Sequence, residues 1–291
     1  MHSSANFFLK VKDYSVSEES FELIRHDKLD LLATYPQPDA INLSRYYQSD
    51  DYISHTDSKR SLFENVYHFI RTIALKNKLN LIASLQKANG TLLDIGAGTG
   101  DFLIAAKNHG WDIIGIEPSD KARAVAMTKG ASFIQNTTDL ESSSCDIITM
   151  WHVLEHVPNY ISQIKELKRL LKPDGTILIA VPNFKSFDAQ HYGEFWAGYD
   201  VPRHLWHFSK TAVETIVASE DLQLVKTVPL KFDAYYVALL SEKYKSGKMN
   251  YFNALITGLK SNYKAKTTNE YSSHIYIIKH RDADEYAPHR I

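Results

Sequence analysis

Short apolar runs alternating with helical stretches are the feature that most restricts how this sequence can fold. Runs that are apolar along their whole length are typical of strands buried on both faces, and such strands belong to a mostly parallel sheet covered by helices. We therefore predict an α/β fold with a seven-stranded sheet and helices on both faces. The predicted strands are residues 91–95, 112–117, 131–135, 145–151, 176–182, 222–228 and 274–280.

The segments outside this pattern predict two additions to the sheet. Residues 1–57 have a mixed pattern and are interpreted as an N-terminal cap, ahead of a main domain that spans residues 58–291. Residues 231–265 are too long for a simple connection between two strands, so we expect an inserted pair of helices there.

The overall charge excludes some classes of partner. The chain has 33 basic and 34 acidic residues, which are interspersed along its length, so no footprint for nucleic acid and no polybasic membrane patch is expected. No apolar run approaches the roughly 20 residues of a membrane span. Cys145 is the single cysteine, which suits a reducing compartment. We expect a cytoplasmic protein that acts on a small-molecule partner, without binding nucleic acid and without stable membrane insertion.

The stretch "LLDIGAGTGDFL" follows the first predicted strand of the sheet and opens a helix. Its glycines allow a ligand to approach the backbone at the carboxyl end of the strand. A dinucleotide-binding loop has the spacing G-x-G-x-x-G, whereas Asp101 stands here in place of the last glycine. Asp94 at the strand end would repel a pyrophosphate and attract an ammonium or a sulfonium. The next strand ends at Glu117, placed to accept hydrogen bonds from ribose hydroxyls.

Three motifs together, "LLDIGAGTGDFL", "IIGIEPS" and "CDIITMWHVLEHV", resemble those of the class I S-adenosylmethionine-dependent methyltransferases. The resemblance covers about residues 88–230. It implies a Rossmann-like sheet whose last strand is antiparallel, S-adenosylmethionine as cofactor and S-adenosylhomocysteine as product.

The resemblance also implies which residues bind the cofactor. The loop of Gly96, Ala97, Gly98 and Gly100, with Asp94, would hold the methionine end, and Glu117 would bind the ribose. The remaining candidates would contact the adenine or the reactive end, and they are Pro118, Asn136 or Asp139, Trp151 and His152. For Asn136 and Asp139 a polar turn without a ligand is an equal alternative. Tyr52 in the N-terminal cap is a candidate to cover the sulfonium, because aromatic faces attract cations; packing of the tyrosines onto the core is the alternative.

Methyl transfer from a sulfonium depends mainly on alignment, and an oxygen acceptor also needs a base. Candidate bases are clustered at His152, Glu155 and His156, where the two histidines would share a face if the segment were helical. Glu155 and His156 resemble the Leu-Glu-His of the ubiquinone-biosynthesis O-methyltransferases, where these residues lie on the acceptor side and can engage a divalent cation. A packing role for His156 remains an alternative. The H-x-x-E-H spacing also occurs in zinc proteases, but it follows a central strand here, so we assign no metal ligands.

The long connection at residues 184–208 contains most of "YDVPRHLWHFS" (199–209) and is predicted to cover the acceptor. We expect Arg203 and His204 to bind the acceptor, with Asp200 orienting one of them. The alternative is an internal ion pair between Asp200 and Arg203, with the histidines bound to backbone carbonyls. Methylation of a small or lipid-like acceptor at a hydroxyl is thus the predicted function. An NAD(P)-dependent enzyme on a related sheet and a cofactor-binding protein without catalysis are the alternatives.

Overall fold

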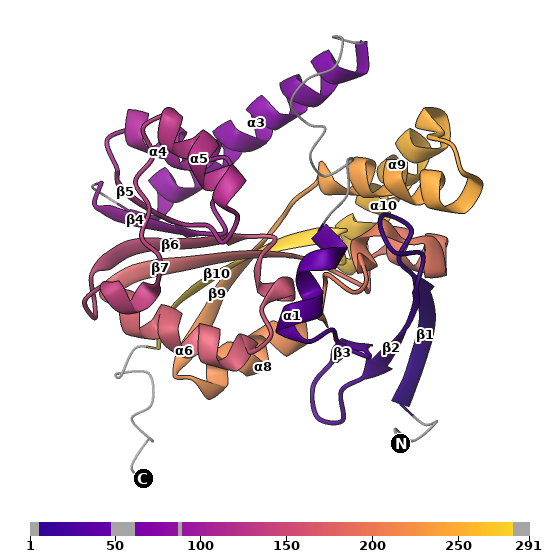
Figure 1. The fold of residues 1–291 in the computed structure, drawn as a ribbon, viewed down its shortest axis with the longest axis horizontal. Helices are drawn as coiled ribbons and strands as arrows, with labels where there is room; N and C mark the ends of the chain where they lie inside the picture. Colours follow the sequence, from indigo (N-terminus) through magenta and orange to yellow (C-terminus); the bar gives the residue numbers. More distant parts are fainter. Residues whose placement is uncertain (1–5, 48–61, 87–88, 282–291) are drawn as a thin grey trace.

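The computed structural model describes residues 6–47, 62–86 and 89–281, which form two sheets and the helices around them (Figure 1). The larger sheet has six strands in the order β5-β4-β6-β7-β10-β9. Neighbours among β5, β4, β6 and β7 are parallel, and β10 is antiparallel to both β7 and β9, as the sequence predicts. The strands are β4 (Thr91–Ile95), β5 (Asp112–Ile116), β6 (Cys145–Trp151), β7 (Leu171–Pro182), β9 (Leu222–Pro229) and β10 (Ser273–His280).

The predicted strand at 131–135 does not form a seventh strand of this sheet. It makes only an isolated parallel bridge, between Phe133 and Gly115 of β5, at the edge of the sheet. The segment is short because Gly130 turns the backbone just before it, with a φ of 89°, and a turn begins at Asn136 just after it. Ser132 and Gln135 are exposed, so only part of the run is available for burial against β5.

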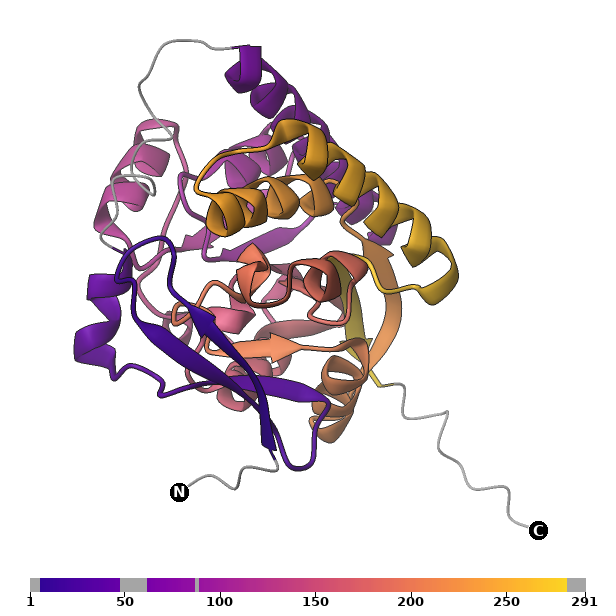
Figure 2. The ribbon, with the colours of Figure 1, turned by 90° about the vertical axis from the view of Figure 1, so that its right-hand side faces the viewer.

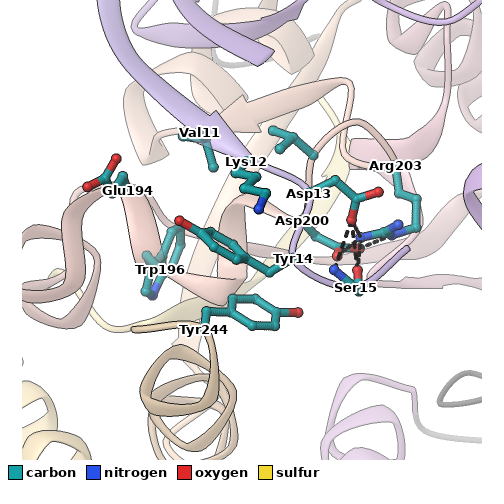
Figure 3. A pocket seen from close by; sticks show the side chains of 11 residues that line it. Val11, Lys12, Asp13, Tyr14, Ser15, Glu194, Trp196, Asp200, Arg203 and Tyr244 are labelled. Carbon is teal, nitrogen blue, oxygen red and sulfur yellow. Dashed lines mark hydrogen bonds and ion pairs between the residues drawn. The ribbon is translucent and has the colours of Figure 1, made fainter. Parts of the chain in front are cut away.

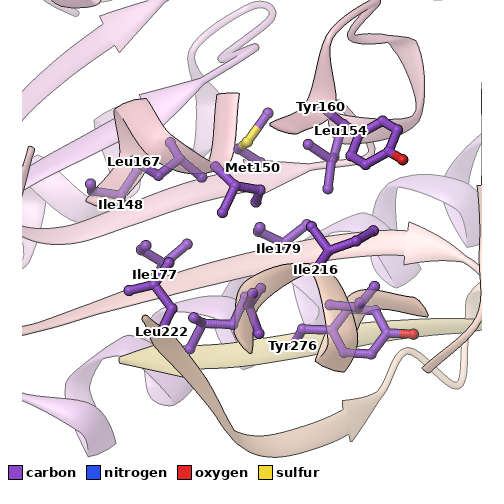
Figure 4. Packing of buried hydrophobic residues seen from close by; sticks show 14 of the residues in the cluster. Ile148, Met150, Leu154, Tyr160, Leu167, Ile177, Ile179, Ile216, Leu222 and Tyr276 are labelled. Carbon is purple, nitrogen blue, oxygen red and sulfur yellow. The ribbon is translucent and has the colours of Figure 1, made fainter. Parts of the chain in front are cut away.

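Alternate residues of the central strands pack into two separate cores. On one face, Leu92, Ile147 and Leu178 are buried against α3 and α4. On the other face, Leu93 and Ile148 are buried against α6 and α8. Figure 4 shows Ile148 in this core with Leu167 of α6 and Ile216 of α8. Because successive side chains of a strand point to opposite faces, the unbroken apolar runs supply both cores.

Five helices cover the two faces of the larger sheet. Figure 1 shows α3, α4 and α5 on one side of the sheet and α6 and α8 on the other. The helices are α3 (Leu62–Leu85), α4 (Asp101–Asn108), α5 (Asp120–Thr128), α6 (Tyr160–Leu170) and α8 (Lys210–Ser219). Three of these helices have a side-chain N-cap. The side chains of Ser119, Asn159 and Ser209 accept a hydrogen bond from a backbone N–H in the first turn of α5, α6 and α8, respectively.

The N-terminal segment forms a small antiparallel sheet together with a strand from the other half of the chain. Its order is β1-β2-β3-β8, and α1 (Ala40–Leu43) and a 3₁₀ turn, η2 (Ser44–Tyr47), follow β3. The strand β8 belongs to the connection after β7, so the N-terminal segment is joined to the larger unit by backbone pairing (Figure 2). The strands are β1 (Phe7–Lys12), β2 (Ser20–Arg25), β3 (Leu31–Tyr35) and β8 (Trp206–Phe208).

Two antiparallel helices precede the last strand, in the region where an inserted pair is expected. They are α9 (Asp233–Ser246) and α10 (Tyr251–Thr268), which lie side by side at the periphery of the molecule (Figures 1 and 2). Among the helices in the described ranges, none is both long enough and apolar enough to cross a membrane.

Candidate active site

The glycine loop between β4 and α4 lies at the carboxyl edge of the parallel strands. Gly96 and Gly98 both adopt the left-handed backbone conformation, with φ of 74° and 54°, which favours glycine. A Cβ on Gly96 would lie 2.4 Å from a methyl carbon of Val153. For a Cβ on Gly98, no atom of the described residues, apart from its chain neighbours, lies within 4 Å. The loop therefore packs closely against the segment after β6 on one side and leaves open space beside Gly98.

Glu117 is held against this loop by the backbone. Its Oε2 accepts a hydrogen bond from the N–H of Gly98 at 2.8 Å, and its Oε1 accepts one from the N–H of Ser119 at 2.8 Å. The N–H groups of Gly96 and Ala97 both donate to the carbonyl of Ile116, at 2.7 and 3.0 Å. These bonds join the tips of β4 and β5 and hold the carboxylate of Glu117 beside the glycine loop; binding of a cofactor by the two together stays a prediction.

Asp94 lies beneath the loop and is buried. Burial raises the pKa of its carboxyl to about 7, against the opposing effect of a 2.6 Å hydrogen bond that the Thr149 hydroxyl donates to Oδ1. The charge of Lys78 also favours the ionised form. A buried carboxylate with a raised pKa gains from a cationic ligand, because the positive charge stabilises the ionised form.

Trp151, at the end of β6, presents its ring to this region. The ammonium of Lys78 from α3 lies 4.1 Å from the ring centroid, and Phe102 packs edge-on against the ring at 5.4 Å. The position shows that the ring face accepts a cation at this edge of the sheet. Sequence reasoning missed Lys78 and Thr149. Thr149 carries a signal, since it is a polar residue within the apolar run of β6. Lys78 has none, because a lysine in a helix gives no local sign that it faces the loop rather than solvent.

The other cofactor candidates have different surroundings. Pro118 and Asn136 are exposed. The backbone N–H of Asn136 donates to the Asp139 carboxylate at 3.4 Å, which is the polar turn considered as the alternative; cofactor binding by Asn136 stays a prediction. Tyr52 lies outside the described residues.

The acceptor candidates follow β6, but they do not lie on an α-helix. His152 adopts a left-handed conformation with φ of 57°, and only the single 3₁₀ turn η4 (Leu154–His156) follows it. Its backbone N–H donates to the carbonyl of Ala180 at 2.9 Å. The condition for a shared helix face is therefore not met, and tertiary contacts position the two histidines separately.

His152 forms ion pairs with two carboxylates. Its Nε2 lies 3.0 Å from Oδ2 of Asp233, the first residue of α9, and its Nδ1 lies 3.4 Å from Oε1 of Glu155. Burial opposes protonation, but the two carboxylates outweigh it and raise the pKa of His152 to about 10. His152 is thus a cation near neutral pH. Sequence reasoning missed Asp233, because the contact depends on how the inserted helices pack.

Glu155 is the most unusual group of the site. It is 1% exposed, and neither of its carboxylate oxygens has a hydrogen-bond partner among the described residues. Burial acts to raise its pKa, but the neighbouring His152 and His204 outweigh this effect and lower it. The ion pair with His152 compensates the charge of Glu155, but a buried carboxylate that accepts no hydrogen bond from the described residues is uncommon and marks a place where a ligand could bind.

His156 and His204 lie beside Glu155 with their rings edge to face, 4.6 Å apart. Nδ1 of His156 lies 3.0 Å from both the carbonyl of Arg203 and the hydroxyl of Tyr47, and Nδ1 of His204 lies 3.0 Å from the carbonyl of Gly198. A carbonyl only accepts, so Nδ1 of His204 donates and its Nε2 carries the lone pair. Burial lowers the pKa of His204 to about 4, so the ring is neutral near pH 7. Ligand atoms of Glu155, His156 and His204 all lie within 4.8 Å of one another.

The guanidinium of Arg203 belongs to a buried ion network that adjoins this cluster, since Oδ2 of Asp200 lies 3.8 Å from Nε2 of His204. Its guanidinium bonds Asp200 at 2.6 and 3.0 Å, Asp13 at 3.1 Å and the carbonyl of Tyr46 at 2.9 Å, and it also contacts Ser15 (Figure 3). Burial acts to raise the pKa of Asp200, but the charge of Arg203 outweighs it and lowers that pKa to about 2. The structure therefore contains the internal ion pair considered as the alternative, and Asp13 extends it to the N-terminal sheet.

The connection that carries Arg203 is folded and packed. It contains α7 (Phe187–Tyr192), the 3₁₀ turns η5 (Gly193–Phe195) and η6 (Ala197–Tyr199), and β8. The N–H of Leu205 donates to the carbonyl of Glu155 at 2.8 Å, and the indole of Trp206 donates to the carbonyl of Val157 at 3.0 Å. Nε2 of His207 donates to the hydroxyl of Thr34 at 3.1 Å, since that hydroxyl donates its own proton to the carbonyl of His204. Of the predicted acceptor residues, His204 reaches the cluster and Arg203 anchors the N-terminal sheet.

Several known proteins are similar to this chain. Residues 66–227 match the family described as "Methyltransferase domain". A ubiquinone biosynthesis O-methyltransferase of Actinobacillus pleuropneumoniae is 37% identical over 131 residues, covering 39% of this chain and 56% of that protein. The Vibrio cholerae protein of the same name is 31% identical over 121 residues, covering 37% and 49%. The chain thus matches about half the length of these curated relatives.

Solved structures show the same fold at low identity. A Thermotoga maritima protein, described as a SAM-dependent methyltransferase and possible histamine N-methyltransferase, aligns with a TM-score of 0.51 at 19% identity, covering 76% of this chain and 97% of that one. Phosphoethanolamine N-methyltransferase 2 of Haemonchus contortus, solved with S-adenosyl-L-methionine, aligns with a TM-score of 0.50 at 16% identity, covering 71% and 53%. Because the family match extends from α3 to β9 and includes the whole glycine loop and the cluster after β6, this chain belongs to the methyltransferase-domain family.

Proposed function

We propose that the protein transfers a methyl group from S-adenosylmethionine to a hydroxyl of a small or lipid-like acceptor. The observation that carries this proposal is the arrangement of carboxylates at neighbouring strand tips. Asp94 and Glu117 flank an open glycine loop, and the next strand, β6, leads to the buried cluster of Glu155, His156 and His204. The first pair suits a cationic nucleoside, and the cluster suits a group that must lose a proton.

The cofactor would be held by residues with separate roles. Asp94 would face the positively charged methionine end, Glu117 would accept from the ribose hydroxyls, and the ring of Trp151 would lie near the sulfonium. Transfer is an in-line displacement, in which the acceptor oxygen forms a bond to the methyl carbon as the bond from carbon to sulfur breaks. The proton of the hydroxyl must leave, and alignment supplies most of the rate.

His156 is the residue we propose as the base. His152 is held as a cation by Asp233 and Glu155, so it is unsuited to accept a proton near neutral pH. His204 is neutral, but its low pKa makes it a weak base. Glu155 lies between these rings and would stabilise the imidazolium that forms when His156 accepts the proton.

The same three side chains also fit a divalent cation, as the resemblance to the O-methyltransferases suggests. Glu155 offers oxygens that accept no hydrogen bond from the part of the chain that the structure describes. Backbone carbonyls accept from Nδ1 of His156 and of His204, as is usual for metal-bound histidines. A bound cation would lower the pKa of the acceptor hydroxyl. Activity lost on treatment with a chelator and restored by Mg²⁺, Mn²⁺ or Zn²⁺ would assign the cluster this role, whereas activity unaffected by the chelator would favour His156 as a base.

Calorimetry and a turnover assay test the proposal. S-adenosylhomocysteine should bind and NADH should not; the reverse would support a dinucleotide enzyme. Labelled S-adenosylmethionine should then methylate members of a panel of quinols, phenols and hydroxylated sugars. His156→Gln should lower kcat by roughly 10² to 10⁴ while the affinity for S-adenosylhomocysteine is kept. Binding without turnover on every acceptor class, N-nucleophiles included, would support a cofactor-binding protein without catalysis.

A further inference from the structure

The helix α10 has its large apolar side chains on the outside. Its buried positions are small or polar, and they are Ala254, Thr257, Gly258, Ser261 and Ala265. Ser261 donates a hydrogen bond at 2.6 Å to the buried carboxylate of Asp188 in α7, which fixes this inner face. The outer positions form what we call the α10 stripe, consisting of Tyr251, Phe252, Leu255, Leu259 and Tyr263.

The α10 stripe is well exposed and continuous. Phe252 is 70% exposed, Leu255 and Leu259 are each 52% exposed, and Tyr263 is 73% exposed. Their spacing of three and four residues places them on one side of the helix, and Figure 2 shows the helix at the outside of the molecule. A contiguous apolar surface of this kind marks a place of interaction.

The inserted helices also carry an excess of positive charge, although the chain as a whole has a net charge of −1. Residues 231–269 contain seven lysines and only two acidic residues. Both acids are engaged inside the protein, since Asp233 pairs with His152 and Glu242 accepts from the hydroxyl of Tyr192 at 3.1 Å. The lysines are mostly exposed, and they are Lys231, Lys243, Lys245, Lys248, Lys260, Lys264 and Lys266. This local excess of lysines corrects the prediction that the charges are interspersed along the whole chain, because the net charge of −1 averages over all segments.

We propose that the α10 stripe, together with the lysines of the inserted helices, is a docking surface for an anionic phospholipid membrane. An amphipathic helix with a basic surround lies in the plane of the membrane interface, with its apolar side chains between the headgroups. Tyr251 and Phe252 at one end of the stripe and Tyr263 at the other suit that interface, because their rings are apolar and the tyrosine hydroxyl is polar. A second copy of this chain is a poorer occupant, because its own lysines would face like charges. The inference does not depend on the identity of the methyl acceptor.

Flotation with vesicles tests the proposal on the full chain. The protein should bind vesicles of phosphatidylcholine and phosphatidylglycerol in equal parts, should bind phosphatidylcholine alone weakly, and should be released by high salt, which screens charges. The variant Leu255→Ser with Leu259→Ser should bind on the order of tenfold more weakly or worse. The variant Lys248→Ser with Lys260→Ser should lose roughly fivefold for each lysine on the mixed vesicles only.

Matched controls lie on α5, where Met127 is 61% exposed and Lys121 is also exposed. Met127→Ser with Lys121→Ser should bind vesicles like the unmodified chain. All variants should keep their melting temperature and their affinity for S-adenosylhomocysteine, because the changed side chains lie on the surface. Absence of binding to the mixed vesicles, or unchanged binding by the leucine variant, would overturn the proposal. So would sedimentation showing that the unmodified chain self-associates through the stripe without binding vesicles.

Discussion

At the scale of single residues, Asp94 combines a structural cost with a proposed function. Burial raises the pKa of its carboxyl from the ordinary 3.8 to about 7, so the stability linked to its protonated form is present below pH 3.8 and is lost as the pH rises through 7. Asp94→Asn keeps an oxygen to accept from Thr149 and removes the buried charge. Above pH 7 we expect the free energy of unfolding of the variant to exceed that of the unmodified chain by up to about 4 kcal/mol. Urea denaturation without cofactor measures this difference.

The same change should abolish the pH dependence of cofactor binding. In the unmodified chain, the affinity for S-adenosylhomocysteine should rise by up to about tenfold per pH unit below pH 7 and level off above it, because the ammonium of the ligand favours ionised Asp94. Calorimetry on either side of pH 7 compares the two proteins. If the affinity of the two proteins for S-adenosylhomocysteine changed in parallel with pH, the charge of Asp94 would not contribute to binding the ligand.

His152 offers a second test at this scale, because its charge depends on Asp233 in the inserted helices. Its pKa is raised from 6.5 to about 10, so the stability that it contributes is complete below pH 6.5 and is lost as the pH rises through 10. Asp233→Asn removes the closer carboxylate, at 3.0 Å, and should lower the pKa of His152 by about one unit or more. Titration of the imidazole signals by NMR measures this change. A smaller change in the pKa of His152 would show that Glu155, and not Asp233, is the main carboxylate that raises it.

At the scale of elements, the contact between β8 and the N-terminal sheet depends on the buried network of Arg203. Replacing one partner of a buried ion pair leaves the other charge without compensation, so Arg203→Met should lower the free energy of unfolding by about 3 to 5 kcal/mol. Arg45→Met, which breaks the exposed pair with Glu19, should change stability little and is the matched control. A normal stability of Arg203→Met together with a raised KM for the acceptor would instead support the acceptor role predicted from the sequence.

At the scale of the whole molecule, the two sheets should unfold together. The small sheet has its fourth strand from the connection after β7, and one apolar cluster joins β1 and β2 to that connection and to α9. Urea unfolding followed by tryptophan fluorescence should coincide with unfolding followed by far-UV circular dichroism, because Trp196 lies in that cluster and Trp111 lies near the larger sheet. Two separated transitions would show that the N-terminal sheet is an independent unit.

The sequence by itself determined the elements whose signals are local. Unbroken apolar runs predicted the strands of the larger sheet. The glycine spacing predicted the loop that follows Asp94, and the length of 231–265 predicted the inserted helices. These features depend on periodicity and backbone conformation, which neighbouring residues set. The prediction of a strand at 131–135 was wrong for the same reason. A local apolar pattern does not show whether a segment at the edge of the sheet forms a full ladder of hydrogen bonds with its neighbour.

Only the tertiary structure decided the contacts between distant segments. The pairing of β8 with β3, the network from Arg203 to Asp13 and the ion pair from His152 to Asp233 each join residues that no local pattern connects. The exposure of the α10 stripe is of the same kind, since a periodic apolar helix predicts burial and only packing shows which face is covered. Bringing distant segments together costs chain entropy, and burial and charge pairing in the folded state offset that cost. Such contacts therefore depend on the whole chain and not on the residues adjacent in sequence.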